Sequence, residues 1–546
     1  MACMKRFWAD RNGNFAMMFG ILAVPLLIGG GLAVDYINLS RQKSSIQEAL
    51  DAAALAVTRE GPKNLTQEQA LEIAKQFVAA NYPELALQVK ARIISDDTVE
   101  ISGETDYPTS FGGVFGAPMV DVAAVSRATY SAIKYEIVFV LDTTGSMAGG
   151  KLMALQAAVT GMIDDIAKEN LPAGTIKYGV VPYAGFVNVG SQYGPVINNI
   201  GLVTKRGASW LDVDARAPIT QADLPQGMSR FALFHHLGQD WKGCVETRQA
   251  SAKGNHDTED TPPVASDPSS LFTPMFAIDE PDNRGDWPYP NSYLGDNRNP
   301  VVPGNTNNGD KINRLKRYGR MATYTYPSTL ETSLLEVQTW RGVSMDNSPS
   351  QLYSNEADPK GPNYGCEIEP IQPLTDNANK VKKMVNQLYA NGSTNTLTGV
   401  TWGWRVLSPG EPFTEGQPKS AKDVVKTMIF LTDGANSFGV LPNSLKSGYT
   451  SLGYLVDGRL NGATSGTNET LGTALDAKTL TACSNIKNDG IEIFTIRLEE
   501  PDVQTGEMLK KCATGPLNFF DAPSRTQLDS IFKSIKKEIM RVRLTS

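Results

Sequence analysis

The stretch that most constrains the fold of this 546-residue chain is Tyr135–Lys151, with the sequence YEIVFVLDTTGSMAGGK. Its apolar run, residues 137–141, is typical of a strand that is buried on both faces, as in a parallel sheet. The run ends at Asp142, and Thr144 and Ser146 follow at alternate positions. The residues beyond have apolar side chains at helical spacing. The sequence therefore predicts a strand, an oxygen-rich loop and a helix, and open α/β sheets place their ligand sites at such loops.

The spacing Asp-x-Thr-x-Ser resembles the metal-ion-dependent adhesion site of von Willebrand factor A domains. This resemblance implies that a second loop supplies a threonine and that a later strand is followed by an aspartate. The loop 391–396 offers Thr394, and the apolar run 428–431 leads to Asp433. The metal site implied by the resemblance consists of Asp142, Thr144, Ser146, Thr394 and Asp433.

Small oxygen ligands suit a hard divalent cation such as Mg²⁺, or else Mn²⁺ or Ca²⁺. The resemblance implies that Thr144 and Ser146 ligate the ion directly and that the aspartates act through bound waters. It also implies that the ion accepts a carboxylate from a protein partner. We expect the first loop to be exposed, so that Asp142 can be replaced without loss of the fold.

The first loop also fits two other sequence patterns. Residues 145–151, GSMAGGK, match the first seven positions of the P-loop pattern, but the eighth is Leu152, which cannot ligate Mg²⁺. A P-loop ATPase is therefore a less favoured alternative. The loop could also merely cap the following helix, but that would leave Asp433 and the second loop unexplained. The only three histidines, between residues 235 and 256, have no assignable acidic partner, so the sequence favours binding over catalysis.

The N-terminal region contains a candidate membrane span. Phe15–Val34 is a run of twenty residues without a charge, which is long enough to cross a bilayer. Lys5, Arg6 and Arg11 precede it, so the positive-inside rule predicts a cytoplasmic N-terminus with the remainder outside. A cleaved secretory signal is the alternative, although no small-x-small cleavage site closes the run.

Beyond the span, residues 36–57 keep a helical pattern, as in the stem of a pilin. The apolar stripe of this stem comprises Ile37, Ile46, Leu50, Ala53, Ala54 and Val57. The segments 11–16, 35–36 and 51–56 resemble the TadE/TadG-like family of the bacterial tight-adherence (Flp) pilus system. The resemblance implies a single-pass inner-membrane protein, periplasmic in bulk, with a TadG-like role and with pilus or secretion-complex components as partners. An envelope or surface adhesin unrelated to pilus assembly is the alternative.

Three parts are expected along the chain. Residues 1–60 form the cytoplasmic tip, the span and the stem, and residues 61–134 form a small mixed α/β segment. Residues 135–546 form the von Willebrand factor A domain, whose alternating strands and helices predict a doubly wound, Rossmann-like α/β sheet. The net charge of −7 gives no sign of a nucleic-acid partner.

A large loop-rich insertion, at about residues 190–375, is expected to interrupt this domain. Of the 32 prolines, 15 fall in residues 251–375, and hydrophobic periodicity is weak there. Disorder is the simplest expectation around residues 255–270 and 295–310. Against disorder of the whole insertion, its tryptophans, such as Trp241, need other side chains to pack on.

Four of the five cysteines follow the span and are expected in an oxidising compartment. Four cysteines allow three connectivities. We favour Cys244–Cys366, inside the insertion, and Cys483–Cys512, near the last strands, since each pair then lies within one structural unit.

Overall fold

The computed structural model describes residues 14–95, 98–129, 133–169, 171–219, 221, 224, 226–251, 254–280, 289–293, 329–338, 360–421 and 423–541. The contacts divide the chain into an N-terminal unit, Met1–Ala132, and a C-terminal unit, Ile133–Ser546. The expected cytoplasmic tip with Cys3 and the expected disorder at 295–310 lie outside the described residues.

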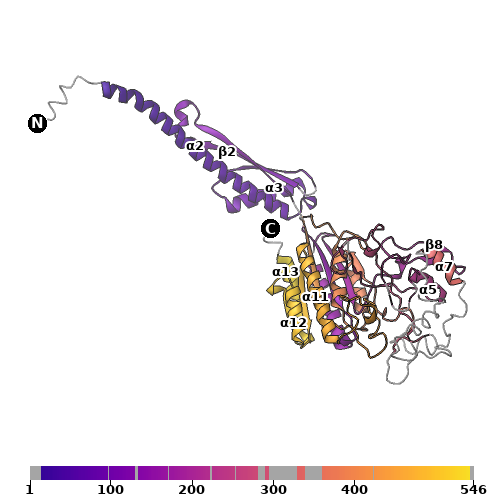
Figure 1. Ribbon diagram of the computed structural model, residues 1–546. Coiled ribbons are helices and arrows are strands. Elements are labelled where there is room, and N and C mark those ends of the chain that lie inside the picture. Colours follow the sequence, from indigo (N-terminus) through magenta and orange to yellow (C-terminus); the bar gives the residue numbers. More distant parts are fainter. Residues whose placement is uncertain are drawn as a thin grey trace, which may run out of the picture. The chain divides into compact units, whose positions relative to one another are not determined.

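The N-terminal unit is built on one continuous 46-residue helix, α2 (Asn14–Arg59), which is the long helix of Figure 1. From Met18 onward this helix is long and apolar enough to cross a membrane. It is followed by the 3₁₀ turn η1 (Pro62–Asn64), the helix α3 (Gln67–Asn81) and an antiparallel sheet in the order β1-β2-β3. The sheet consists of β1 (Gln88–Ile93), β2 (Thr98–Pro108) and β3 (Met119–Thr129), with the 3₁₀ turn η2 (Gly112–Phe115) between the last two.

The second half of α2 packs into the same core as α3 and the sheet. Ile46, Leu50 and Val57 are fully buried together with Val99 of β2. The expected stem at 1–60 and the expected segment at 61–134 thus share one core. Ile37, which the sequence places on the buried stripe, is 49% exposed.

The C-terminal unit contains a six-stranded sheet in the order β12-β5-β4-β13-β14-β15, in which all neighbours are parallel except β12 and β5. Its strands are β4 (Lys134–Asp142), β5 (Ile176–Tyr183), β12 (Gln372–Thr375), β13 (Val424–Thr432), β14 (Glu492–Leu498) and β15 (Phe519–Ala522). The predicted mixed α/β class is confirmed.

Helices cover both faces of this sheet. Alternate residues of β4 enter two different cores, with Phe139 in one and Val138 and Val140 in the other. One core includes α4 (Gly150–Ala167), α9 (Ala378–Gln387) and α13 (Leu528–Arg541). The other core includes α10 (Thr396–Leu407), α11 (Asn468–Asn488) and α12 (Val503–Cys512). This double burial explains why the β4 sequence is a continuous apolar run.

The insertion between β5 and β12 consists of short elements joined by loops. In its described part these include β6 (Val187–Asn188), η4 (Ser191–Tyr193), β7 (Val196–Ile197), β8 (Val203–Lys205), α5 (Arg230–His236), β9 (Cys244–Val245), β10 (Ala250–Ser251), β11 (Gly254–Asn255), η5 (Pro268–Ser270) and α7 (Leu330–Gln338). Its described part packs on the α10 face of the sheet, where Phe272 lies 4.9 Å from Trp402 between ring centroids.

The stretch 255–270 is ordered, so the expectation of disorder there is wrong. The buried guanidinium of Arg248 donates hydrogen bonds to the carbonyl oxygens of Thr261 at 2.7 Å, Ser270 at 3.0 Å and Glu259 at 3.2 Å. The buried guanidinium of Arg248 thus binds three backbone carbonyl groups of this polar loop, which has no hydrophobic periodicity of its own.

Two disulfides join the pairs that the sequence favours. Cys244–Cys366 links β9 to the segment before β12, and Cys483–Cys512 links α11 to α12. Each bridge therefore lies inside the C-terminal unit.

Candidate metal site

Asp142, the last residue of β4, is fully buried at the carboxyl edge of the sheet. The backbone N–H and the hydroxyl of Thr144 both donate to its Oδ1, at 2.9 and 2.6 Å. The hydroxyl of Thr432, at the end of β13, donates to Oδ2 at 2.7 Å, and the Tyr183 hydroxyl lies 3.4 Å from the same oxygen. The expectation that this part of the loop is exposed is therefore wrong for Asp142 and Thr144, which is 1% exposed.

Asp433, directly after β13, meets the same loop from the neighbouring strand. The Ser146 hydroxyl donates to its Oδ1 at 2.6 Å and lies 3.0 Å from the Thr144 hydroxyl oxygen. The ammonium of Lys151, in the first turn of α4, lies 2.6 Å from Oδ2. An unbroken chain of polar contacts thus joins Asp142 to Asp433.

Thr394, on the loop before α10, lies near Ser146 and next to Gly434, the residue after Asp433. A Cβ added to Gly434 would be 3.4 Å from the Thr394 hydroxyl oxygen and 3.7 Å from that of Ser146. The second loop is attached to the first, because the N–H of Gly145 donates to the carbonyl oxygen of Gly392 at 3.0 Å. The structure thus brings all five residues of the sequence-predicted site together.

The electrostatics of this cluster favour a cation. Burial, and then the negative charge of Asp433, raise the pKa of Asp142 to about 6. Lys151 offsets one of the two carboxylates, and a bound cation would stabilise both. The donors are hydroxyl and carboxylate oxygens, which fit a hard divalent ion. Within the described residues no three His, Cys, Asp or Glu side chains could hold a metal, so a metal here depends on the hydroxyls.

Three residues that hold the cluster were not singled out from the sequence. Thr432 and Tyr183 end β13 and β5, and the Tyr183 hydroxyl also donates to the carbonyl oxygen of Leu431 at 3.1 Å. In the sequence, Lys151 stands out only as part of a P-loop-like pattern. Their positions at the ends of apolar strands and at the helix start are the signal that could have identified them.

Tyr183 is itself held by a close approach of α10, which gives a testable prediction. A Cβ on Gly399 would lie 2.7 Å from Cδ1 and 2.8 Å from Cγ of the Tyr183 ring. Ala normally stabilises a helix interior by up to about 1 kcal/mol relative to Gly, but overpacking here should make Gly399→Ala destabilising by about 1–3 kcal/mol. In Gly161→Ala of α4, where nothing lies within 4 Å, thermal unfolding should show no loss. Equal melting temperatures for both variants would contradict the tight packing.

A cavity of about 400 Å³ is lined by residues on both sides of Thr394 in the chain, including Ser393 and Asn395. Its wall carries the aromatic side chains of Phe186, Tyr289, Tyr364, Phe438 and Tyr449. The insertion and the loop after β13 supply these rings, so the insertion shapes the surface next to the cluster.

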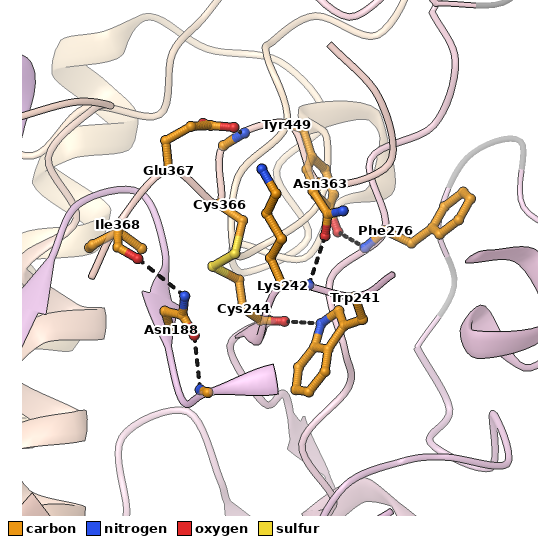
Figure 2. The surroundings of a disulfide bond; sticks show 12 residues. Asn188, Trp241, Lys242, Cys244, Phe276, Asn363, Cys366, Glu367, Ile368 and Tyr449 are labelled. Atoms are coloured by element: carbon orange, nitrogen blue, oxygen red, sulfur yellow. Dashed lines mark hydrogen bonds between the residues drawn. A yellow bond between two sulfur atoms is a disulfide. The ribbon is translucent and has the colours of Figure 1, made fainter. Parts of the chain in front are cut away.

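The Cys244–Cys366 bridge supports this wall (Figure 2). Gly365 and Glu367, on either side of Cys366, both line the cavity. The indole N–H of Trp241 donates to the carbonyl oxygen of Cys244 at 2.8 Å and fixes the other end of the bridge. The disulfide therefore ties one cavity wall to a buried part of the insertion.

Comparison with solved structures finds pilus proteins at low similarity. The pilus adhesin SpaC from Lactobacillus rhamnosus GG is 10% identical, with 83% of this chain and 34% of SpaC covered and a TM-score of 0.30. The vWF domain of the type V pili tip protein Mfa5 from Porphyromonas gingivalis is 10% identical, with coverages of 74% and 95% and a TM-score of 0.31. The pilus adhesin RrgA from Streptococcus pneumoniae is 10% identical, with coverages of 83% and 49% and a TM-score of 0.31. The chain spans about a third of the length of SpaC.

No curated protein matches the chain. A family model matches residues 13–60, which contain the whole of α2, and is described as "Putative Flp pilus-assembly TadE/G-like". The chain therefore carries a Flp pilus-assembly TadE/G-like segment over residues 13–60, which relates it to pilus assembly.

Proposed function

We propose that the protein is a membrane-anchored, metal-dependent binding protein of the tight-adherence (Flp) pilus assembly system, with a TadG-like role. The observation that carries the metal-dependent part is the convergence of five oxygen-bearing side chains at the carboxyl edge of a parallel sheet. These are Asp142, Thr144, Ser146, Thr394 and Asp433. The pilus-related part rests on the TadE/G-like segment.

In this proposal the C-terminal unit is a von Willebrand factor A domain with a large insertion. The hydroxyls of Thr144 and Ser146 would hold Mg²⁺, or Mn²⁺ or Ca²⁺, with Asp142 and Asp433 behind them and Thr394 beside them. When bound, the ion would supply a Lewis-acidic position for a carboxylate of a protein partner. Of the three site residues on the first loop, Ser146 is the exposed one, so the cluster is reachable from solvent on its side.

The cavity beside Thr394 would then be the surface that meets the rest of the partner. Its aromatic rings and backbone groups suit a mixed apolar and polar segment rather than a second charge. Because the insertion supplies much of this wall, it would decide which acidic partner is accepted.

Two alternatives receive less support. An adhesin unrelated to pilus assembly would leave the TadE/G-like segment unexplained. A P-loop ATPase would need Lys151 for phosphate, whereas its ammonium is paired with the buried carboxylate of Asp433 at 2.6 Å. Binding rather than turnover is therefore the function we propose.

The proposed location is the inner membrane, with a cytoplasmic N-terminus and the bulk of the chain in the periplasm. The basic residues before the apolar part of α2 and the two disulfides both support this orientation. A reporter that is active only in the periplasm, fused after Ser546, should be active. Activity of a cytoplasmic reporter at the same position would contradict the orientation.

The metal proposal is tested by calorimetric titration of the detergent-solubilised full chain with Mg²⁺. One site that is lost on addition of a chelator is expected. Absence of any divalent-ion binding, with Mn²⁺ and Ca²⁺ included, would remove the metal from the proposed function and leave only the pilus relation.

A further inference from the structure

The loop between β2 and β3 lies against the part of α2 that could cross a membrane. A Cβ on Gly31 would lie 2.7 Å from Cγ and 2.8 Å from Cδ1 of the Phe111 ring. The ring therefore lies directly on the helix backbone, at a position where any larger residue would push it away. Leu27 and Val34 line a shallow apolar hollow with the same ring.

The depth of this contact follows from the helix geometry. Twenty uncharged residues at about 1.5 Å each span about 30 Å, the thickness of the hydrocarbon core. Gly31 lies three residues before Val34, the end of the uncharged run, so Phe111 packs about 4.5 Å inside that end. The loop itself has no charged residue from Tyr107 to Val120.

A loop can enter the apolar part of a membrane only if its backbone groups have hydrogen-bond partners. The carboxylate of Asp35 accepts the N–H groups of Ser110 and Phe111 at 2.8 Å each and that of Gly112 at 2.7 Å. Three more N–H groups bond to carbonyl oxygens of the loop, those of Thr109, Gly116 and Ala117. Asp35, directly after the apolar run, thus accepts hydrogen bonds from the three N–H groups of the loop that lie nearest to α2.

We propose that the loop 109–119 is a second membrane contact, which enters the lipid interface beside the span of α2. Phe111 would lie at the level of the acyl chains, and Asp35 at the boundary with the headgroups. Phe111 is 45% exposed and shares one apolar surface with Leu26 and Leu27, which are 73% and 74% exposed. The partner we infer is phospholipid, because this surface is uncharged and adjoins the span. The inference rests on the membrane-anchor part of the proposed function.

Site-specific photo-crosslinking of the full chain in phospholipid vesicles tests this contact. Benzoylphenylalanine is placed at position 111, where it keeps an aromatic ring, at Leu27 in the span, and at Thr129 at the far end of β3. We expect a mass increase of one phospholipid at positions 111 and 27, and none at 129.

The controls separate the two levels of the proposal. A lipid adduct at position 27 without one at 111 would overturn the loop contact and leave the anchor intact. No lipid adduct at either position would overturn the anchor itself. An adduct to another polypeptide at 111 in place of lipid would show that the loop docks on a protein, and would also overturn the inference.

Discussion

Asp142→Asn is expected to abolish the Mg²⁺ binding that we propose for the cluster, or to weaken it at least about tenfold, because a charge interaction at about 4 Å is worth several kcal/mol in a protein. Asparagine keeps the shape of the side chain and one acceptor oxygen for Thr144 or Thr432. Calorimetric titration of the full chain measures the change. Asp142→Ala and Asp433→Ala should lose the metal in the same way.

The matched control for this variant is Asp423→Asn. Asp423 directly precedes β13, whereas Asp433 directly follows it, so the control removes a carboxylate at the opposite end of the same strand. Its Mg²⁺ binding should be unchanged. Without metal, Asp142→Asn should melt no lower than the wild type, because burial and the charge of Asp433 disfavour the ionised Asp142. Unchanged Mg²⁺ affinity in Asp142→Asn would show that the cluster is not a metal site.

Removing the Cys244–Cys366 bridge by the double change Cys244→Ser and Cys366→Ser is expected to give the largest loss of stability. The two cysteines are 122 residues apart, and in the chain-entropy model a loop of that length corresponds to about 5 kcal/mol. Thermal unfolding and limited proteolysis of the full chain measure the effect. New cleavage should appear first in the insertion, whose wall the bridge supports.

The second disulfide provides the comparison. Cys483–Cys512 spans 29 residues, so Cys483→Ser with Cys512→Ser should cost about 3–4 kcal/mol in the same model. It should also leave the protease resistance of the insertion unchanged. A larger loss from this second pair would contradict the order that the two loop lengths predict.

The sheet and the cluster could be predicted because their sequence signals are local. A strand buried on both faces reads as an apolar run, and an aspartate after such a run marks the carboxyl edge of the sheet. Asp142 and Asp433 satisfy both conditions. Lys151 and Asp433 are 282 positions apart in the chain. A local sequence pattern cannot reveal that two such distant residues form an ion pair.

The ordered part of the insertion could not be predicted, for a related reason. Residues 255–270 gain their order from Arg248 and from neighbours on the α10 face, and not from periodicity of their own. The stem shows the opposite error. The apolar stripe of the helix begins at Ile37, which is exposed. The core that buries this stripe begins later in the helix, and Ile46 is already fully buried in it. Periodicity shows which face of a helix is apolar, and tertiary contacts decide where along the helix that face is covered.

The ion pair between Lys151 and Asp433 has a consequence for how fast a partner would arrive. With a divalent ion in place and Lys151 still paired, the cluster would carry a surplus of positive charge against the net negative charge of the whole chain. An acidic partner would then be attracted locally and repelled by the remaining surface, so that only approaches aimed at this edge of the sheet would be accelerated. Dissolved salt would weaken both effects, because charges more than about 8 Å apart are largely screened at physiological ionic strength.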